Sequence, residues 1–398
     1  MTRRLLSFAL LALLGGCPPA ARRPQRPADR PGALRIEVIP TPLYAGVQLS
    51  LLGELTQLLF HLNLHNASER ALEVKTVELA ALDADGALLS RRILAPALLR
   101  RRLRPVGWIV MRDRQTIAAA HRYQGRLRRP KGDTRIEPRG VVSLTHLLLI
   151  QRARALPARI RVVVLHAAGT ATTEVRVHRY RQKTRLTLPV QGRWWVMGGN
   201  RYDEHHGCAI LASQNFAHDL GVIGADQMTF SGDRTRNGSY LAHGRPIVAA
   251  ADGEVVSVHD GVAENTPVGA RPDWQSILRR PRDVGGNHVV IRHTPDEHTV
   301  YMHMRPGLKV RAGQRVKRGE VLGHCGNSGN SLEAHLHFQL QDRADPLQAS
   351  GLPARFSDFT FHMGHVGFHV PAQRSAPLPL RLFVEPGRAD HAVEWRGR

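Results

Sequence analysis

The stretch GNSGNSLEAHLHFQL, residues 326–340, holds two histidines, His335 and His337, separated by one apolar residue. On a β-strand, side chains at positions i and i+2 project from the same face, so we expect both imidazoles to point at one spot. The Gly-, Asn- and Ser-rich residues 326–331 predict a turn into that strand, at the rim of a sheet. One imidazole in such a pair can bind a metal ion while the other moves a proton.

Further motifs accompany this pair over a little under half of the chain. They are FAHDLGV (216–222), HGRPIVAAADGEVVSVHDG (243–261), GGNHVVIRH (285–293), TVYMHMRPGLKVRAGQRVKRGEVLGHCGNSGNS (299–331) and AHLHFQL (334–340). In order and spacing they resemble the lysostaphin/LytM-type zinc endopeptidases, which cut peptidoglycan cross-bridges. The resemblance implies a LytM-type antiparallel β-sheet domain, Zn²⁺ as cofactor and peptidoglycan as substrate.

The resemblance also implies metal ligands, because catalytic zinc is usually held by three protein groups. Asp219 matches the carboxylate ligand of the family, and His337 matches a histidine ligand. The family commonly carries a histidine four residues before that aspartate, but this chain has Asn215 there. Upstream lie His205 and His206; we favour His206 as the third ligand, with His205 as its substitute and the side-chain oxygen of Asn215 as a weaker alternative.

Two histidines are candidates for catalysis. His335 is expected to act as the general base, and His303, in Tyr301-Met302-His303, matches the family position that helps to stabilise the tetrahedral intermediate. Imidazole titrates near pH ~6.5, which suits proton transfer close to neutrality. His218 adjoins Asp219 and therefore faces the opposite side of a strand, where we expect it to pack.

Composition describes the whole chain. Its 398 residues are enough for two domains, and its net charge of +23 comes almost entirely from arginine. Such a charge favours polyanionic partners. Aromatic residues make up only 5% of the chain, and no recognition motif interleaves them with the arginines. The sequence therefore argues against nucleic-acid binding.

Residues 1–17 have the pattern of a signal peptide, with two arginines before a short apolar run. The residues that end at Cys17 resemble a bacterial lipobox, which implies lipidation of Cys17 and a membrane anchor. Pro18, not aspartate, follows the cysteine, which favours the outer membrane, with the protein facing the periplasm. The Pro/Arg-rich residues 18–32 predict an extended tether.

Residues 33–189 predict an all-β domain that resembles an Ig-like sandwich. Alternating apolar or β-branched runs occupy 34–39, 58–66, 72–82, 141–150, 159–167 and 172–180. The composition of residues 97–104 permits a short helix.

Residues 190–361 form the predicted peptidase domain, and residues 362–398 a C-terminal extension. Strands are expected at 246–250, 253–259, 288–292, 298–303 and 335–340, mostly antiparallel because the connections are short. Residues 262–284 exceed a hairpin loop, and either wall a substrate groove or form a passive insertion.

Cys208 and Cys325 remain after lipidation, and either pair as a disulfide or stay as two free thiols.

Two other functions stay open beside the hydrolase. Relatives of this fold that lose ligands act as regulators of separate wall amidases, and Asn215 in place of histidine is compatible with such a regulatory envelope partner. Retention of Asp219, His303, His335 and His337 argues against it. The arginine excess and the first domain are also compatible with a wall-binding lipoprotein.

Overall fold

The computed structural model describes residues 33–50, 53–107, 125–152, 156–198, 211–270, 273–379, 381–390 and 392–395. The predicted signal peptide with Cys17, the tether 18–32, His205, His206 and Cys208 lie outside these ranges. Within them, no helix is both long and apolar enough to cross a membrane.

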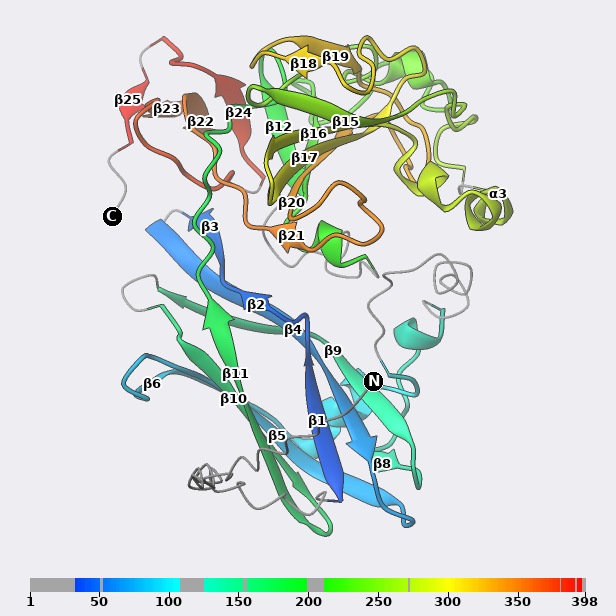
Figure 1. Cartoon of the computed structure of the whole chain (residues 1–398), viewed down its shortest axis with the longest axis vertical. Helices are drawn as coiled ribbons and strands as arrows, with labels where there is room; N and C mark the ends of the chain where they lie inside the picture. Colours follow the sequence, from blue (N-terminus) through cyan, green and yellow to red (C-terminus); the bar gives the residue numbers. More distant parts are fainter. Residues whose placement is uncertain are drawn as a thin grey trace, which may run out of the picture.

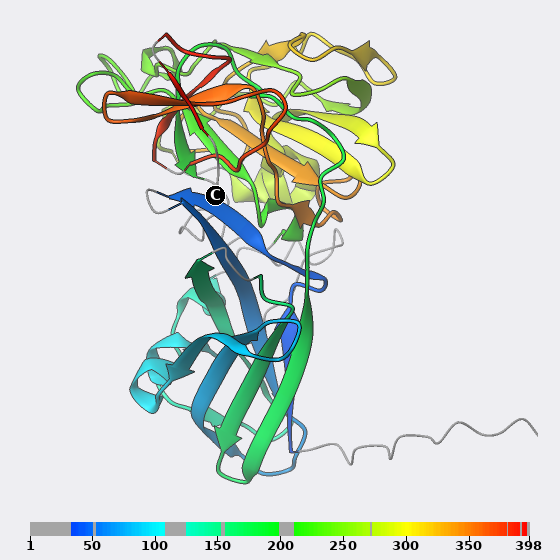
Figure 2. The ribbon, with the colours of Figure 1, turned by 90° about the vertical axis from the view of Figure 1, so that its left-hand side faces the viewer.

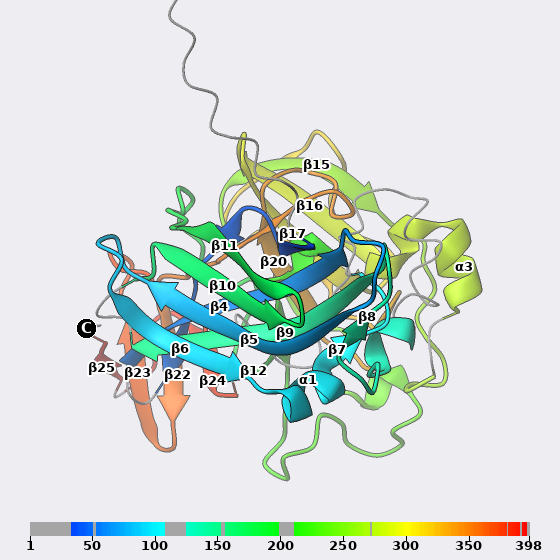
Figure 3. The same ribbon diagram turned by 90° about the horizontal axis from the view of Figure 1, so that it is seen from below.

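Two sheets build an N-terminal unit, at the bottom of Figure 1. The first has the order β1 (Leu34–Ile39), β4 (Gly53–Asn66), β9 (Val141–Arg152) and β7 (Leu103–Arg104), with β3 (Gly46–Ser50) also paired to β4. The second has the order β2 (Leu43–Tyr44), β11 (Gly169–His178), β10 (Arg159–His166), β5 (Leu72–Leu82) and β6 (Leu88–Leu94), with β8 (Arg135–Ile136) paired to β5. Helix α1 (Pro96–Arg102) follows β6. Figure 3 shows β5, β10 and β11 side by side.

Alternating apolar side chains of the two sheets form one core. Phe60 and Leu62 of β4 are fully buried with Val77 of β5 and Val162 of β10 in a single cluster. The sheets therefore pack face to face. The six strands expected here are all present, and the all-β fold class is confirmed. The assignment of this unit as Ig-like stays a prediction.

The second unit is built on one long sheet. Its order is β18 (Arg315–Val316), β15 (Gly253–His259), β16 (Asn287–Thr294), β17 (Glu297–Met304), β20 (Leu336–Gln341), β13 (His218–Gly221), β12 (Trp194–Gly198), β24 (Phe383–Pro386), β22 (Phe359–Met363), β23 (Val366–Val370) and β25 (Val393–Glu394), with β21 (Gly351–Leu352) also paired to β20. Among these strands only β23 and β25 pair in parallel, so the predicted antiparallel sheet is confirmed.

Smaller elements surround this sheet. They are the pair β14 (Pro246–Val248) and β19 (Val321–His324), helix α3 (Trp274–Arg279), and the 3₁₀ turns η1 (Ala212–Gln214), η2 (Asn237–Ser239) and η3 (Pro281–Gly285).

The C-terminal residues differ from the expected separate extension. β22 spans the expected boundary after residue 361, and it pairs with β24, which pairs with β12. Hydrophobic side chains from these strands join the same core as β20. Residues after 361 thus continue the second sheet.

Strand β20 shows how the sheet presents a site. Leu336, Phe338 and Leu340 point into the main core of the second unit. The alternate residues, His337 and the two glutamines that follow it, project from the opposite face. They are buried as well, so this polar row needs hydrogen-bond partners.

The units have separate cores. A connector leaves β11 and runs into the second unit, visible in green in Figures 1 and 2. It contacts the β16–β17 hairpin through Tyr180, Lys183 and Thr184.

Candidate metal and catalytic site

Neighbouring strands bring the predicted site residues together. Asp219 on β13 lies directly opposite His337 on β20, and Met302 on β17 lies opposite His337 from the other side. His303 follows Met302. His335 lies just before β20, in a bridge with Gly326, whereas the sequence predicted it within the strand.

Asp219 is the centre of this cluster. Its Oδ1 lies 3.1 Å from Nδ1 of His337 and 3.5 Å from Nε2 of His335. The three side chains are largely buried. The expectation that both histidines of the pair point at one spot therefore agrees with the structure.

His303 completes the cluster from β17. Its ring centroid lies 4.9 Å from that of His335 and 5.7 Å from that of His337. Its backbone has φ = +63°, a left-handed conformation that a non-glycine residue adopts at some energetic cost and that recurs at functional sites. Nδ1 lies 2.8 Å from the carbonyl of Ser328, to which it donates.

The pKa values of the two candidate catalytic histidines, His303 and His335, are shifted in opposite directions. Burial, with the nearby rings of His335 and His337, holds the pKa of His303 well below its ordinary value. Burial also disfavours the charged form of His335, but the charge and hydrogen bond of Asp219 outweigh it and raise the pKa of His335. The Nδ1–H of His335 donates to the carbonyl of Glu333 over 2.9 Å.

The donor atoms of His337 and Asp219 fit a zinc ion. Nε2 of His337 lies 2.9 Å from Oε1 of Gln339, so this nitrogen carries the proton, and a neutral ring then has its lone pair on Nδ1. That lone pair faces a carboxylate oxygen 3.1 Å away, an arrangement that a cation between the two atoms stabilises. Imidazole nitrogen and carboxylate oxygen are common zinc ligands.

The third ligand is not supplied by the described residues. Among them, no three His, Cys, Asp or Glu side chains form a group that could hold a metal ion. The favoured His206 and its substitute His205 lie outside the described ranges. Asn215 lines a small pocket with Pro42 and Tyr44 of the N-terminal unit, a pocket that none of the candidate catalytic side chains lines.

The turn before His335 is held by the segment 262–284. The side-chain amide of Asn265 donates to the carbonyls of Gly329 and Ser331, each over 2.9 Å. Gly329 of this turn packs closely on Gly286: a Cβ added to Gly329 would lie 2.3 Å from the backbone nitrogen of Gly286. The sequence left two interpretations of residues 262–284, a wall of a substrate groove or a passive insertion. In the structure this segment positions the turn before His335.

Comparison with known proteins assigns the family of this region. Residues 239–349 match peptidase family M23. They form an M23 peptidase domain. The match includes His303, His335 and His337, whereas Asp219 precedes it.

Curated relatives are similar over a limited region. The peptidoglycan DD-endopeptidase ShyA of Vibrio cholerae is 38% identical over 84 residues, which are 21% of this chain and 19% of that protein. ShyB, a peptidoglycan DD-endopeptidase of the same organism, is 37% identical over 95 residues, 23% of this chain and 22% of that protein. This chain therefore spans about a fifth of the length of these relatives.

A solved structure is similar to part of this chain. The catalytic domain of lysostaphin from Staphylococcus simulans matches with 18% identity, over 40% of this chain and 88% of that one, at a TM-score of 0.23.

Two other predictions concern single residues of the second unit. His218, beside Asp219, is fully buried and packs edge-on against Phe356, at 5.5 Å between ring centroids, as expected for a packing histidine. Cys325 is a buried free thiol in the structure, and burial raises its pKa. Its candidate partner Cys208 lies outside the described residues, so the choice between a disulfide and two free thiols stays a prediction.

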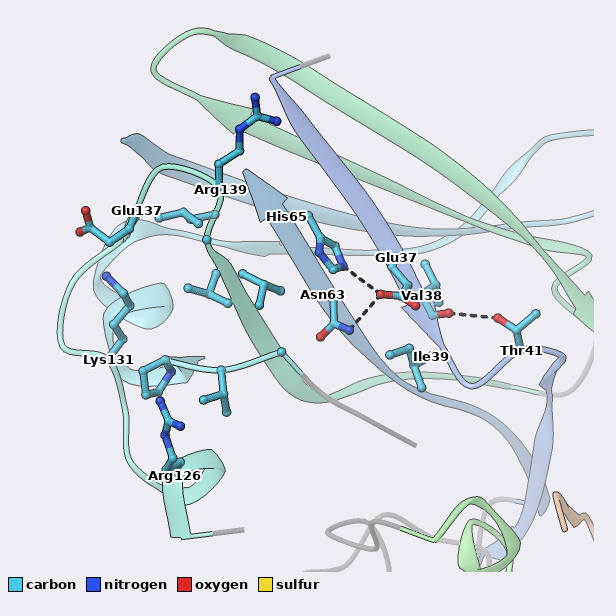
Figure 4. Close-up of a pocket in the computed structure, with 17 residues that line it drawn as sticks. Glu37, Val38, Ile39, Thr41, Asn63, His65, Arg126, Lys131, Glu137 and Arg139 are labelled. Atoms are coloured by element: carbon cyan, nitrogen blue, oxygen red, sulfur yellow. Dashed lines mark hydrogen bonds and ion pairs between the residues drawn. The ribbon is translucent and has the colours of Figure 1, made fainter. Parts of the chain in front are cut away.

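A separate hollow of about 1050 Å³ lies in the N-terminal unit, outside the M23 domain (Figure 4). On its wall, Asn63 and His65 both contact Oε2 of Glu37, at 3.0 and 2.9 Å. Burial opposes the charge of Glu37, yet these contacts hold its pKa below the ordinary value. No residue of this hollow belongs to the cluster around Asp219, so the candidate site lies in the second unit.

Sequence reasoning missed the residues that support His337. Gln339 and Gln341 follow it at alternate positions and are fully buried. The signal was present: polar residues alternate with Phe338 and Leu340 in a strand that is otherwise apolar. Asn265, which holds the turn, carried no such pattern.

Proposed function

We propose that the protein is a zinc-dependent endopeptidase that hydrolyses amide bonds in the stem or cross-link peptides of peptidoglycan. The observation that carries the proposal is the convergence of Asp219, His337, His335 and His303 from neighbouring strands on one buried spot. The M23 domain and its endopeptidase-named relatives support it.

A bound zinc ion would be held by Asp219, His337 and an upstream histidine, and would supply Lewis acidity toward the scissile carbonyl and the attacking water. His335 takes the proton of that water at Nε2, because its Nδ1–H is held by the Glu333 carbonyl and Asp219 stabilises the imidazolium that forms.

The role of His303 changes from the one that the sequence indicated. Its Nδ1–H donates to Ser328, so Nε2 of the neutral ring bears a lone pair. A lone pair cannot donate to an oxyanion. We therefore propose that His303 orients the attacking water by accepting a hydrogen bond from it.

The proposal includes location and partners. Lipidation at Cys17 would anchor the protein to the bacterial envelope, periplasm-facing and in the outer membrane, within reach of peptidoglycan. The competing proposal is an inactive regulator that activates a separate wall amidase. It is favoured only by Asn215 at the position of the family's usual histidine.

The deciding experiment measures the zinc content of the purified protein together with digestion of isolated sacculi. Wild type is compared with His206→Ala and His337→Ala, and with His365→Ala as a control at an exposed histidine. We expect one zinc per chain and release of muropeptides in wild type and control, and loss of both in the other variants. Wild type without zinc and without digestion would leave the regulator.

A further inference from the structure

Three polar side chains form a row on one face of β20. His337, Gln339 and Gln341 are at most 1% exposed, and the residues between them belong to the hydrophobic core. Buried amides are costly unless they are hydrogen-bonded, so the partners of each group in this row matter.

The hydrogen bonds of the row have a fixed direction. The amide nitrogen of Gln341 lies 2.7 Å from the carbonyl of Arg343 and 3.4 Å from that of Ala344. Backbone carbonyls only accept, so this end of Gln341 must be its NH₂ group. Its oxygen then accepts from the NH₂ group of Gln339, over 2.5 Å. Gln339 is left with its oxygen toward Nε2 of His337.

We propose that Gln339 and Gln341 are positioning residues that fix the tautomer of His337 for metal binding. The backbone carbonyls orient Gln341, and Gln341 orients Gln339. The oxygen of Gln339 then accepts the hydrogen bond that Nε2–H of His337 donates. Nδ1 is then left with its lone pair, 3.1 Å from Oδ1 of Asp219. This inference rests on the proposed function only in that the metal is zinc.

Loss of the Gln339 oxygen has a specific consequence. A neutral His337 ring would then move its proton to Nδ1, because Nδ1–H can donate to Asp219. That single hydrogen bond would occupy both atoms that are needed as ligands. Loss of a side chain that orients a metal-binding histidine typically lowers metal affinity by about 10- to 100-fold.

Two variants at position 339 separate this role from a structural one. Gln339→Met and Gln339→Glu both lose the hydrogen bond donated to Gln341, so both should unfold at a lower temperature in excess chelator. They differ in the acceptor presented to His337, which only glutamate keeps. We expect zinc affinity, measured by competition with a chromophoric chelator, to fall about 10- to 100-fold in Gln339→Met. It should stay within about threefold of wild type in Gln339→Glu. The exposed Gln348→Met serves as control.

A second measurement needs no zinc. ¹⁵N NMR of the imidazoles in zinc-free protein, at about pH 9 where imidazole is neutral, reports which nitrogen carries the proton. We expect the Nε2–H form of His337 in wild type and in Gln339→Glu, and a shift toward Nδ1–H in Gln339→Met. The same tautomer in all three, or equal zinc affinity in the two variants, would overturn the inference. A wild type that binds no zinc but shows the expected tautomers would refute the proposed function, while the control of the His337 tautomer by Gln339 and Gln341 would stand.

Discussion

At the residue scale, the hydrogen-bond partner of one imidazole nitrogen determines what the other nitrogen can do. His303 and His335 each give Nδ1–H to a backbone carbonyl, whereas His337 gives Nε2–H to an amide oxygen. In their neutral forms the first two therefore offer Nε2 as an acceptor, and the third offers Nδ1. The three histidines of this site therefore differ in which ring nitrogen remains available to a ligand.

Another buried histidine, His288, should make the free energy of unfolding depend on pH. His288 on β16 donates Nδ1–H to the carbonyl of Gly286, and burial lowers its pKa to about 4. The unfolded chain binds a proton near pH ~6.5, where the folded protein does not. The contribution of His288 is therefore complete above pH ~6.5 and is lost as the pH falls toward about 4, by about 3 kcal/mol.

Replacement of His288 by asparagine checks this prediction, because asparagine keeps a donor for Gly286 and does not titrate. Urea unfolding in the presence of a chelator would be measured between about pH 7 and pH 4, the window of the shift. We expect the free energy of unfolding to fall less steeply with acid in His288→Asn. Parallel curves for the two proteins would contradict the assignment.

At the element scale, the turn before β20 depends on a segment distant in sequence. Asn265 supplies two hydrogen bonds to this turn, and the backbone nitrogen of Asn327 donates to Glu264 over 2.9 Å. Glu264 is in turn held by His243. The position of His335 thus follows from contacts with residues 262–284.

We predict that Asn265→Ala reduces sacculus digestion about 10-fold while zinc content stays at the wild-type level, because small misplacement of a catalytic group is costly. The free energy of unfolding should fall by about 1–2 kcal/mol for the two lost hydrogen bonds. Asn330→Ala, at an exposed asparagine of the same turn, is the matched control. Equal activity of the two variants would show that the segment does not position His335.

The elements themselves were largely predictable. β1 and β5 begin and end where the alternation of apolar residues begins and ends. Asp219, His303, His335 and His337 were predictable as a set because they stand in short local motifs. The orientation of His303 toward Ser328 was not, since it depends on a contact between segments 25 residues apart. Sequence also gave no sign that the C-terminal strands would extend the sheet from β12.

At the scale of the whole molecule, one buried carboxylate joins the connector to the second unit. Glu297, in the β16–β17 hairpin, is fully buried. It accepts hydrogen bonds from the hydroxyl of Tyr180 and from the backbone nitrogens of Lys183 and Thr184, the last two over 2.6 and 2.7 Å. Burial and the bond to Glu297 raise the pKa of Tyr180. Tyr180 also stacks edge-on against Tyr44 of the N-terminal unit.

We therefore predict that Glu297→Gln releases the connector. A glutamine has one acceptor oxygen and would turn its NH₂ group toward a backbone N–H, so the loss should be about 3 kcal/mol. Limited proteolysis should then cut the connector, and thermal unfolding should separate into two transitions, because each unit has its own core. Asp296→Asn is the matched control, since this neighbour pairs with Lys183 at the surface and such pairs add little. Equal cleavage of the two variants would show that Glu297 does not hold the units together, whereas cleavage in Glu297→Gln alone would make this buried carboxylate the joint between them.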